Sequence, residues 1–258
     1  MELIDPIFDS HAHYDAEQFD ADRSTLLAEL PQRGVAGVLN MGTDLETSRQ
    51  TLRLTEQYAY IYGAAGIHPE CAAELPEDWL EQLRALLRHD KIKAVGEIGL
   101  DYHYLDLCPR DRQQQVLTAQ LKLANQLDYP VVLHDREAHG DMMDFLRRFR
   151  PKGVMHCFSG SVEMAREIIK LGLYIGLDGP VTFKNARHSV EVAREIPLER
   201  LLLETDSPYM APEPVRGRRN DSSNLRYIGE KIAEIRGVAP EIIFNATMEN
   251  TKRLFGIA

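Results

Sequence analysis

The chain has 258 residues, a length that suits one large α/β domain, because barrels of alternating strands and helices fold at about 250 residues as a single unit. Hydrophobic residues make up 44% of the chain, enough for a sizeable core, and no stretch approaches the apolar length of a membrane span. The formal net charge of −10 argues against a general nucleic-acid coat protein, which usually carries a basic surface. It leaves room for an enzyme that holds a few phosphates in a local basic pocket.

Targeting signals and cysteines both bear on the compartment. Residues 1–5 contain neither a basic region nor a signal-like apolar core, so we expect a cytoplasmic protein. The three cysteines, Cys71, Cys108 and Cys157, are an odd number without metal-ligand spacing, so a disulfide framework is not expected. Cys157 directly follows a histidine, but adjacent strand residues point to opposite faces, which favours a buried free thiol.

Strand-like apolar runs alternate with amphipathic runs along the whole chain. The expected strands are roughly 6–11, 35–41, 61–67, 92–97, 130–134, 153–157, 173–177 and 201–205. The expected helices are 22–33, 45–58, 79–88, 111–128, 138–149, 162–171, 186–195, 224–236 and a short C-terminal pair, 240–244 and 248–255. This alternation predicts a parallel sheet closed into a (β/α)8 TIM barrel, with one domain over residues 1–258. The long irregular stretch 207–223 follows the eighth strand, where functional loops are common.

Histidines and acids close many of the strand-like runs. His11 and His13 close the first run, Glu97 the fourth, His134 the fifth, His156 the sixth and Asp206 the eighth. In a barrel of parallel strands, all the carboxyl ends lie at one pole, which is where active sites are found. Imidazoles and carboxylates gathered there are the ligands that a divalent transition metal needs.

Each of these positions also has an alternative interpretation. His11 and His13 are two apart on a strand and share a face, so they suit a metal, although a hydrogen-bonded pair of core histidines has the same spacing. A buried Glu97 needs cations nearby, either two metals that it bridges or an arginine in a salt bridge. His134 and His156, taken singly, have the pattern of core histidines, and their joint placement favours metal.

The acid at the end of strand eight has two possible metal-linked roles. Asp206 is positioned to ligate metal or to deprotonate a water, while a turn-forming aspartate is the alternative. Glu204, one step deeper on the same face, is expected to support the site from behind. His68 after strand three is either a substrate contact or a capped loop histidine, and Asp101 is similarly open.

One dense basic patch interrupts this acidic chain, Arg216-Gly217-Arg218-Arg219-Asn220. A solvated surface is the simple interpretation of such a run. Its place after strand eight favours anion binding, because phosphate sites of this barrel often use the loops after strands seven and eight. The planar fork of arginine matches phosphate oxygens.

Six motifs together resemble the TatD family of metal-dependent hydrolases, from about residue 7 to residue 255. They are Ser10-His11-Ala12-His13, Gly66-Ile67-His68-Pro69, Gly96-Glu97-Ile98-Gly99-Leu100-Asp101-Tyr102, His156-Cys157-Phe158-Ser159-Gly160, Glu204-Thr205-Asp206-Ser207-Pro208 and Arg216-Gly217-Arg218-Arg219-Asn220. The resemblance implies an amidohydrolase-like barrel with metal-dependent deoxyribonuclease activity, often 3′ to 5′ on single strands. It also implies that the metal positions are His11, His13, Glu97, His134, His156 and Asp206.

Two loops depart from the family pattern. The family usually continues the basic patch with Glu-Pro and an aromatic residue, whereas this chain has Asp221-Ser222-Ser223-Asn224. The Gly-x-His-Pro motif is often followed by histidine or threonine, and Glu70 stands there in this chain. Both departures fall in expected substrate loops and concern the substrate more than the chemistry.

The mechanism expected from these residues is hydrolysis by a water activated by two divalent ions, magnesium, manganese or zinc. One ion is expected on His11, His13, Glu97 and Asp206, and the second on Glu97, His134 and His156. Asp206 and Glu97 are the expected catalytic residues. The expected substrate contacts are His68, Arg216, Arg218, Arg219 and Asn220. Glu97 stands where amide- and lactone-cleaving relatives carry a lysine, which favours phosphodiesters.

The expected substrate is a phosphate-containing molecule such as a DNA end, with no membrane and no obligate protein partner. Two other hypotheses remain open. One is hydrolysis of a different ester or amide on the same metals, as in a D-aminoacyl-tRNA deacylase. The other is a non-catalytic binding barrel, which the intact ligand set disfavours because buried polar groups without partners are destabilising.

Overall fold

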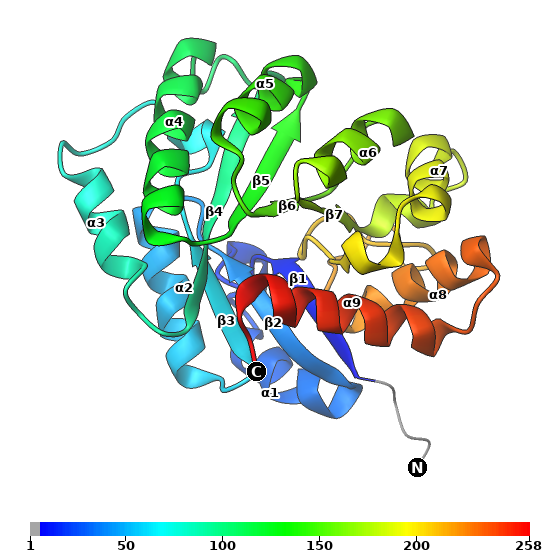
Figure 1. Cartoon of the computed structure of the whole chain (residues 1–258). Helices are drawn as coiled ribbons and strands as arrows, with labels where there is room; N and C mark the ends of the chain where they lie inside the picture. The colour runs from blue at the N-terminus through cyan, green and yellow to red at the C-terminus, as the bar shows by residue number, and fades with distance from the viewer. Residues whose placement is uncertain (1–5) are drawn as a thin grey trace. The chain divides into compact units, whose positions relative to one another are not determined.

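The computed structural model describes residues 6–258, so residues 1–5, where no signal-like segment is expected, lie outside the described residues. Strands and helices alternate along the chain (Figure 1). Eight strands follow one another in chain order in one sheet, and the registers within it are parallel. This is the (β/α)8 barrel architecture that the sequence predicts.

The boundaries of most elements agree with the expected ones. The strands are β1 (Ile7–Ala12), β2 (Val35–Met41), β3 (Ile61–Ala65), β4 (Ile92–Asp101), β5 (Val131–Arg136), β6 (Gly153–Met155), β7 (Tyr174–Leu177) and β8 (Leu201–Leu203). The α-helices are α1 (Arg23–Glu29), α2 (Leu45–Gln57), α3 (Trp79–Leu86), α4 (Arg110–Leu127), α5 (His139–Phe149), α6 (Val162–Lys170), α7 (Arg187–Glu195), α8 (Leu225–Arg236) and α9 (Pro240–Phe255). Short 3-10 helices include η3 (Pro69–Cys71), η4 (Gly179–Thr182) and η6 (Ser222–Asn224).

The described chain forms two compact units, and the prediction of a single domain over 1–258 stays a prediction. Unit 1 contains residues 6–40, Cys157–Glu167 and Ile175–Ala258. Its last strands join its first: β7 pairs with β8 from Ile175–Leu201 to Leu177–Leu203, Ala12 pairs with Ser207, and β1 pairs with β2. Helices α8 and α9 pack on β1 and β8. Unit 1 therefore brings the carboxyl ends of β1 and β8 together.

Unit 2 contains Met41–His156 and Ile168–Tyr174. Here β3, β4, β5 and β6 pair in order, with α2 on β3, α4 on β4 and α5 on β5. Helix α2 begins with a capping box, because the Asp44 side chain accepts from the Thr47 amide while Thr47 bonds back to the Asp44 amide. A buried cluster of Ile67, Ala72, Cys108 and Val116 packs beneath the segment that carries His68.

Two predicted elements are wrong. Strand β4 does not end at Glu97 but continues to Asp101, because Gly99 lets it approach β5 closely: a Cβ there would lie 1.9 Å from the His134 carbonyl oxygen. The expected C-terminal pair of helices is the single helix α9. The residues between its halves include neither glycine nor proline, and the Thr247 hydroxyl donates to the Ile243 carbonyl within the helix.

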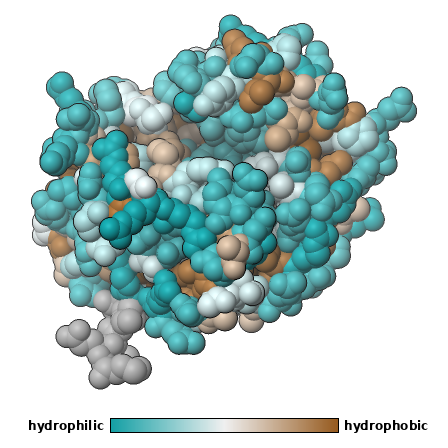
Figure 2. Space-filling view, turned by 180° about the vertical axis from the view of Figure 1, so that it is seen from behind, coloured by the Kyte–Doolittle hydropathy of each residue, from teal (hydrophilic) through white to brown (hydrophobic). Residues whose placement is uncertain are grey.

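The molecular surface and the cysteines bear on the compartment. Figure 2 shows a face dominated by hydrophilic residues, with hydrophobic residues in scattered patches. Within residues 6–258, no helix has the length and apolarity needed to cross a bilayer. Cys71, Cys108 and Cys157 are all free thiols, and burial raises the pKa of Cys157 well above its usual value. The cytoplasmic location stays a prediction.

Candidate active site

Unit 1 carries the first group of candidate metal ligands at the carboxyl ends of β1 and β8. The Nε2 atoms of His11 and His13 lie 3.1 Å apart. Oδ1 of Asp206 lies 3.5 Å from the first and 3.3 Å from the second. His11 and His13 are buried, while the side chain of Asp206 keeps 15% exposure. These three ligand atoms can therefore meet one ion that solvent still reaches.

Backbone hydrogen bonds hold the two strand ends of this group in register. The Asp206 amide donates to the His11 carbonyl at 2.9 Å, and the His13 amide donates to the Ser207 carbonyl at 2.7 Å. The ladder between β8 and β1 thus continues past the end of β8, so the side chains that follow each strand face one another. The backbone of residues 11–13 and that of residues 206–207 therefore hold each other in place.

Asp9 secures this arrangement from below, a role that the sequence alone did not indicate. Its Oδ1 accepts from the amides of His11 at 3.3 Å and Thr205 at 3.0 Å. Its Oδ2 accepts from the hydroxyls of Thr205 at 2.5 Å and Ser222 at 2.6 Å. Burial outweighs these bonds and raises the pKa of Asp9 to about 6. One carboxylate therefore joins β1, the segment before Asp206 and the end of the basic loop.

Glu204 lies deeper in unit 1. It is fully buried, and its carboxylate accepts from the Cys157 amide and from the Ser10 hydroxyl. A Cβ on Gly176 would lie 2.4 Å from Oε2 of Glu204, so the glycine leaves the space that this carboxylate occupies. Burial raises the pKa of Glu204 well above its usual value. Its contacts brace the strands around the first ligand group.

Unit 2 carries the second group, centred on Glu97. Its Oε1 lies 2.8 Å from Nε2 of His156, 3.0 Å from Nδ1 of His134 and 3.5 Å from Nε2 of His68. Glu97 is 4% exposed, so its charge is surrounded by imidazoles rather than by water. His68, Glu97 and His134 have the separations of a metal-binding triplet. Glu97 of β4, His134 of β5 and His156 directly after β6 are thus brought together.

Asp101 orients one of these imidazoles. Its Oδ2 lies 3.0 Å from Nε2 of His134, while its Oδ1 accepts from the amides of His103 and Tyr104. Burial lowers the pKa of His134, but hydrogen bonds to Asp101 and Glu97 outweigh it and raise the pKa to about 10. With Nε2 engaged by Asp101, Nδ1 of His134 is left to face Glu97. Asp101, which the sequence left open, is a positioning residue.

His68 caps the loop that carries it, which is one of its two predicted roles, and its contact with substrate stays a prediction. Its Nδ1 accepts from the Glu70 amide at 3.3 Å and so caps η3. Its other ring nitrogen, Nε2, is the atom that faces Glu97. The ring packs edge to face against His134, with centroids 4.5 Å apart. His68 thus belongs to the Glu97 group while it holds its own loop.

The basic loop divides into two kinds of residue. Arg219 forms a bidentate pair with Asp22, at 2.7 Å for each bond, and lies over the Phe19 ring. Asn220 donates to the carbonyls of Thr205 and Tyr209 and accepts from Asp221 and Asn224. These four hydrogen bonds use the donors and acceptors of the side-chain amide, so Asn220 positions the loop, and its predicted contact with substrate stays a prediction. Arg216 and Arg218 are exposed.

Sequence reasoning missed Asp178, which directly follows β7. It is 3% exposed, and among residues 6–258 its Oδ2 has no hydrogen-bond partner. Burial, with the negative charge of Asp206, raises the pKa of Asp178 to about 7. The signal was an acid at the end of an apolar run, the same pattern that picked out Asp206.

Barrels with histidine and carboxylate clusters at their strand ends include the metal-dependent hydrolases, and comparison with known proteins places this chain in that class. Residues 8–256 match the model of the TatD related DNase family, and the chain belongs to that family. The class agrees with the ligand groups found in each unit.

Individual relatives cover nearly the whole chain. An uncharacterized metal-dependent hydrolase, YabD of Bacillus subtilis, is 41% identical, over 97% of this chain and 99% of its own. The 3′-5′ ssDNA/RNA exonuclease TatD of Citrobacter koseri is 35% identical, over 98% of this chain and 100% of its own. The crystal structure of the TatD homologue YjjV from Escherichia coli has a TM-score of 0.91 at 35% identity and covers 98% of both chains. The barrel fold and the hydrolase class are thereby shown.

Proposed function

We propose that this protein is a metal-dependent deoxyribonuclease that removes nucleotides from the 3′ end of single-stranded DNA with a metal-activated water. The observation that carries the proposal is the presence, in a TatD family chain, of the His11, His13 and Asp206 group and of the Glu97 group. A relative of nearly full overlap is named as a 3′-5′ ssDNA/RNA exonuclease. The relative at 41% identity is named only as an uncharacterized metal-dependent hydrolase.

The donor atoms fit divalent metal ions. Unit 1 offers two imidazole nitrogens and one carboxylate oxygen, and unit 2 offers imidazoles of His134 and His156 with the Glu97 carboxylate. We assign one ion to each group; that Glu97 bridges the two ions stays the prediction made from the sequence. The imidazole-rich sets favour zinc or manganese over magnesium. Such ions lower the pKa of water toward neutrality and stabilise developing charge on phosphate oxygens.

The chain's own side chains supply the remaining steps. Asp206 is the more exposed member of its group and takes the proton of the attacking water at a carboxylate oxygen. Asp9 and Asp101 hold His11 and His134 in place. Arg216 and Arg218, exposed and without a carboxylate partner within residues 6–258, bind the substrate phosphates.

The test is a substrate panel on chelated and metal-reloaded protein. We expect release of mononucleotides from 5′-labelled single-stranded DNA, slower action on duplex DNA, and no action on D-aminoacyl-tRNA. His11→Ala abolishes release, while His188→Ala, an exposed histidine of α7, serves as the matched control. If the protein deacylates D-aminoacyl-tRNA and leaves DNA uncleaved, the alternative ester hydrolase is established instead. DNA cleavage by thoroughly chelated protein would overturn the metal dependence.

A further inference from the structure

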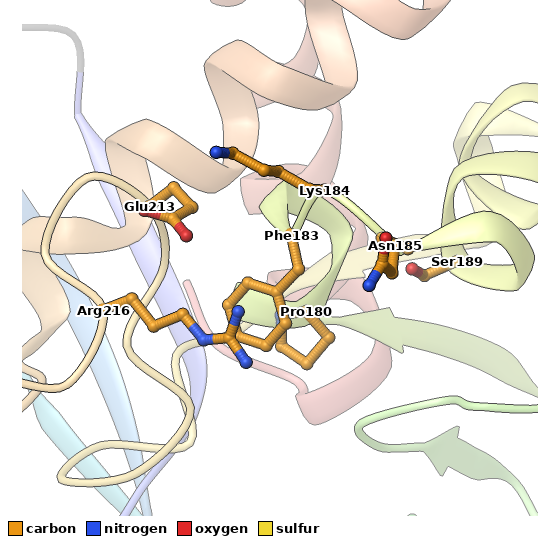
Figure 3. A pocket seen from close by; sticks show the side chains of 8 residues that line it. Pro180, Phe183, Lys184, Asn185, Ser189, Glu213 and Arg216 are labelled. Carbon is orange, nitrogen blue, oxygen red and sulfur yellow. The ribbon is translucent and has the colours of Figure 1, made fainter.

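A cavity of about 530 Å³ opens in unit 1 between two segments that follow β7 and β8. Its lining includes Phe183, Lys184, Asn185 and Ser189 from η4 to α7, and Glu213 and Arg216 from the basic loop (Figure 3). Both segments leave the carboxyl ends of their strands, the end where Asp206 lies. The volume is in the range of small-molecule sites, about 300–1,000 Å³.

Arg216 and Phe183 form a stacked pair in this cavity. The guanidinium carbon lies 4.0 Å from the centroid of the Phe183 ring. Figure 3 shows the arginine reaching the ring from the basic loop, while Asn185 and Ser189 lie on the other side of the ring. A cation over an aromatic face presents two flat, polarisable surfaces, which is the arrangement that accepts a nucleobase.

The two segments are locked together around the cavity. The Glu213 amide donates to the Thr182 hydroxyl at 2.9 Å, and that hydroxyl donates to the Gly179 carbonyl at 2.7 Å. Gly179 itself packs so tightly that a Cβ would lie 1.7 Å from the Met210 carbonyl oxygen. The cavity is therefore formed before any ligand arrives, which lowers the entropy cost of binding.

The polar lining matches a nucleotide better than a free phosphate. The Asn185 amide both donates and accepts, as a base edge does, and the Ser189 hydroxyl can do the same. The Glu213 carboxylate repels a phosphate inside the cavity, but it can accept hydrogen bonds from exocyclic base amines. Lys184 is exposed and offers its ammonium group to a backbone phosphate at the rim.

We propose that this cavity is a nucleotide subsite, which holds one base of the single-stranded substrate against the Phe183–Arg216 pair. The proposal rests on the proposed nuclease function for its substrate class. It assigns Phe183, Asn185 and Ser189 to base recognition, and it gives Arg216 a stacking role in addition to its charge. One nucleotide held here positions the strand relative to Asp206 in the same unit.

The primary test is binding to metal-free protein, so that it does not depend on cleavage. The probe is a short oligonucleotide that carries 2-aminopurine at each position in turn. We expect fluorescence quenching at one position on binding to the wild type, and loss of that quenching in Phe183→Leu. The dissociation constant rises about 10-fold or more, as for loss of one stacked base. Tyr227→Leu, which replaces an exposed aromatic residue of α8, is the matched control, and it should keep the quenching and the dissociation constant of the wild type.

A second variant keeps the proposal testable if Phe183→Leu folds poorly. Arg216→Lys keeps the positive charge at this exposed position but removes the flat guanidinium that stacks on Phe183. We expect it to lower the quenching while the salt dependence of oligonucleotide binding changes little. Unchanged quenching and affinity in both variants would overturn the subsite and leave the nuclease function standing. Quenched binding by a metal-loaded wild type that never cleaves DNA would overturn the nuclease function and leave the subsite standing.

Discussion

The Asp101 carboxylate fixes the direction in which the His134 ring points: Oδ2 lies 3.0 Å from Nε2, and Nδ1 lies 3.0 Å from Glu97. Asp101→Asn should weaken metal binding at the Glu97 group by about 10–100-fold, because the ligand loses its oriented partner. Metal titration followed by elemental analysis measures the change. The control is Asp135→Asn, which alters a 2.8 Å carboxylate–histidine pair with the exposed His139. Equal metal affinity in Asp101→Asn and the wild type would contradict the positioning role.

Metal removal should abolish hydrolysis and lower stability together. Within each unit the histidine and carboxylate ligand atoms lie close enough to share an ion, and an ion that binds only the folded state stabilises it, by about 2.7 kcal/mol at 100 times its dissociation constant. Thermal melting of chelated and manganese- or zinc-reloaded protein measures the shift. His13→Ala should reduce both the shift and the bound metal. If added metal leaves the melting temperature unchanged, the proposed metal site is contradicted.

Asp206→Asn separates proton transfer from ligation. The amide keeps one oxygen for a metal but does not accept a proton near pH 7. If Asp206 is the base, turnover falls by roughly 10²–10⁴-fold with metal content retained. If it acts as a ligand alone, metal is lost and excess metal rescues the variant. Single-turnover kinetics with elemental analysis distinguishes these results, and full metal with near-normal turnover would exclude both roles.

The arginines of the basic loop should respond differently to the same substitution. Arg216→Gln and Arg218→Gln raise KM for DNA and flatten its salt dependence, because each removes an exposed phosphate contact. Arg219→Gln lowers the melting temperature instead, because its partner is Asp22. Asp22→Asn should reproduce the Arg219 effect, and the double variant should add little to either. If KM for DNA remains steeply salt-dependent in Arg216→Gln and Arg218→Gln, the substrate phosphates bind other residues.

Asp178 should make the metal-free protein less stable as the pH rises. Burial raises its folded-state pKa from 3.8 to about 7, so between these values the folded chain retains a proton that the unfolded chain releases. Its stabilising contribution is complete below about pH 4 and is lost as the pH rises through about 7. Asp178→Asn should therefore raise the free energy of unfolding more at pH 8 than at pH 5. Urea denaturation measures this, with the exposed Asp144→Asn as control.

Strand ends could be predicted from the sequence, whereas contacts across the chain could not. The apolar runs that stop at His11, His134 and Asp206 do mark β1, β5 and β8, and each of these residues lies at or near the carboxyl end of its strand; their roles as metal ligands stay predictions. The predicted end of the fourth strand at Glu97 was wrong, because the close approach of β5 at Gly99, which lets β4 continue to Asp101, is a contact between distant segments. The residues next to Asp9 in the sequence do not indicate that it binds Ser222. The residues next to Arg219 likewise do not indicate that it pairs with Asp22. Those pairs exist only once the loop after β8 has folded back.

The Asp9 carboxylate has a further consequence for how this enzyme can diversify. The loop after β8 leaves next to Asp206, whose amide is bonded to His11, and it returns at Ser222, whose hydroxyl is bonded to Asp9. Both ends of the loop are thus bonded to β1, the strand that carries His11 and leads into His13. Within this stretch Glu213 and Arg219 are bonded to Thr182 and Asp22, so new substrate contacts can be gained by mutation at its exposed positions, such as Arg218, while the metal-binding strand ends stay in register.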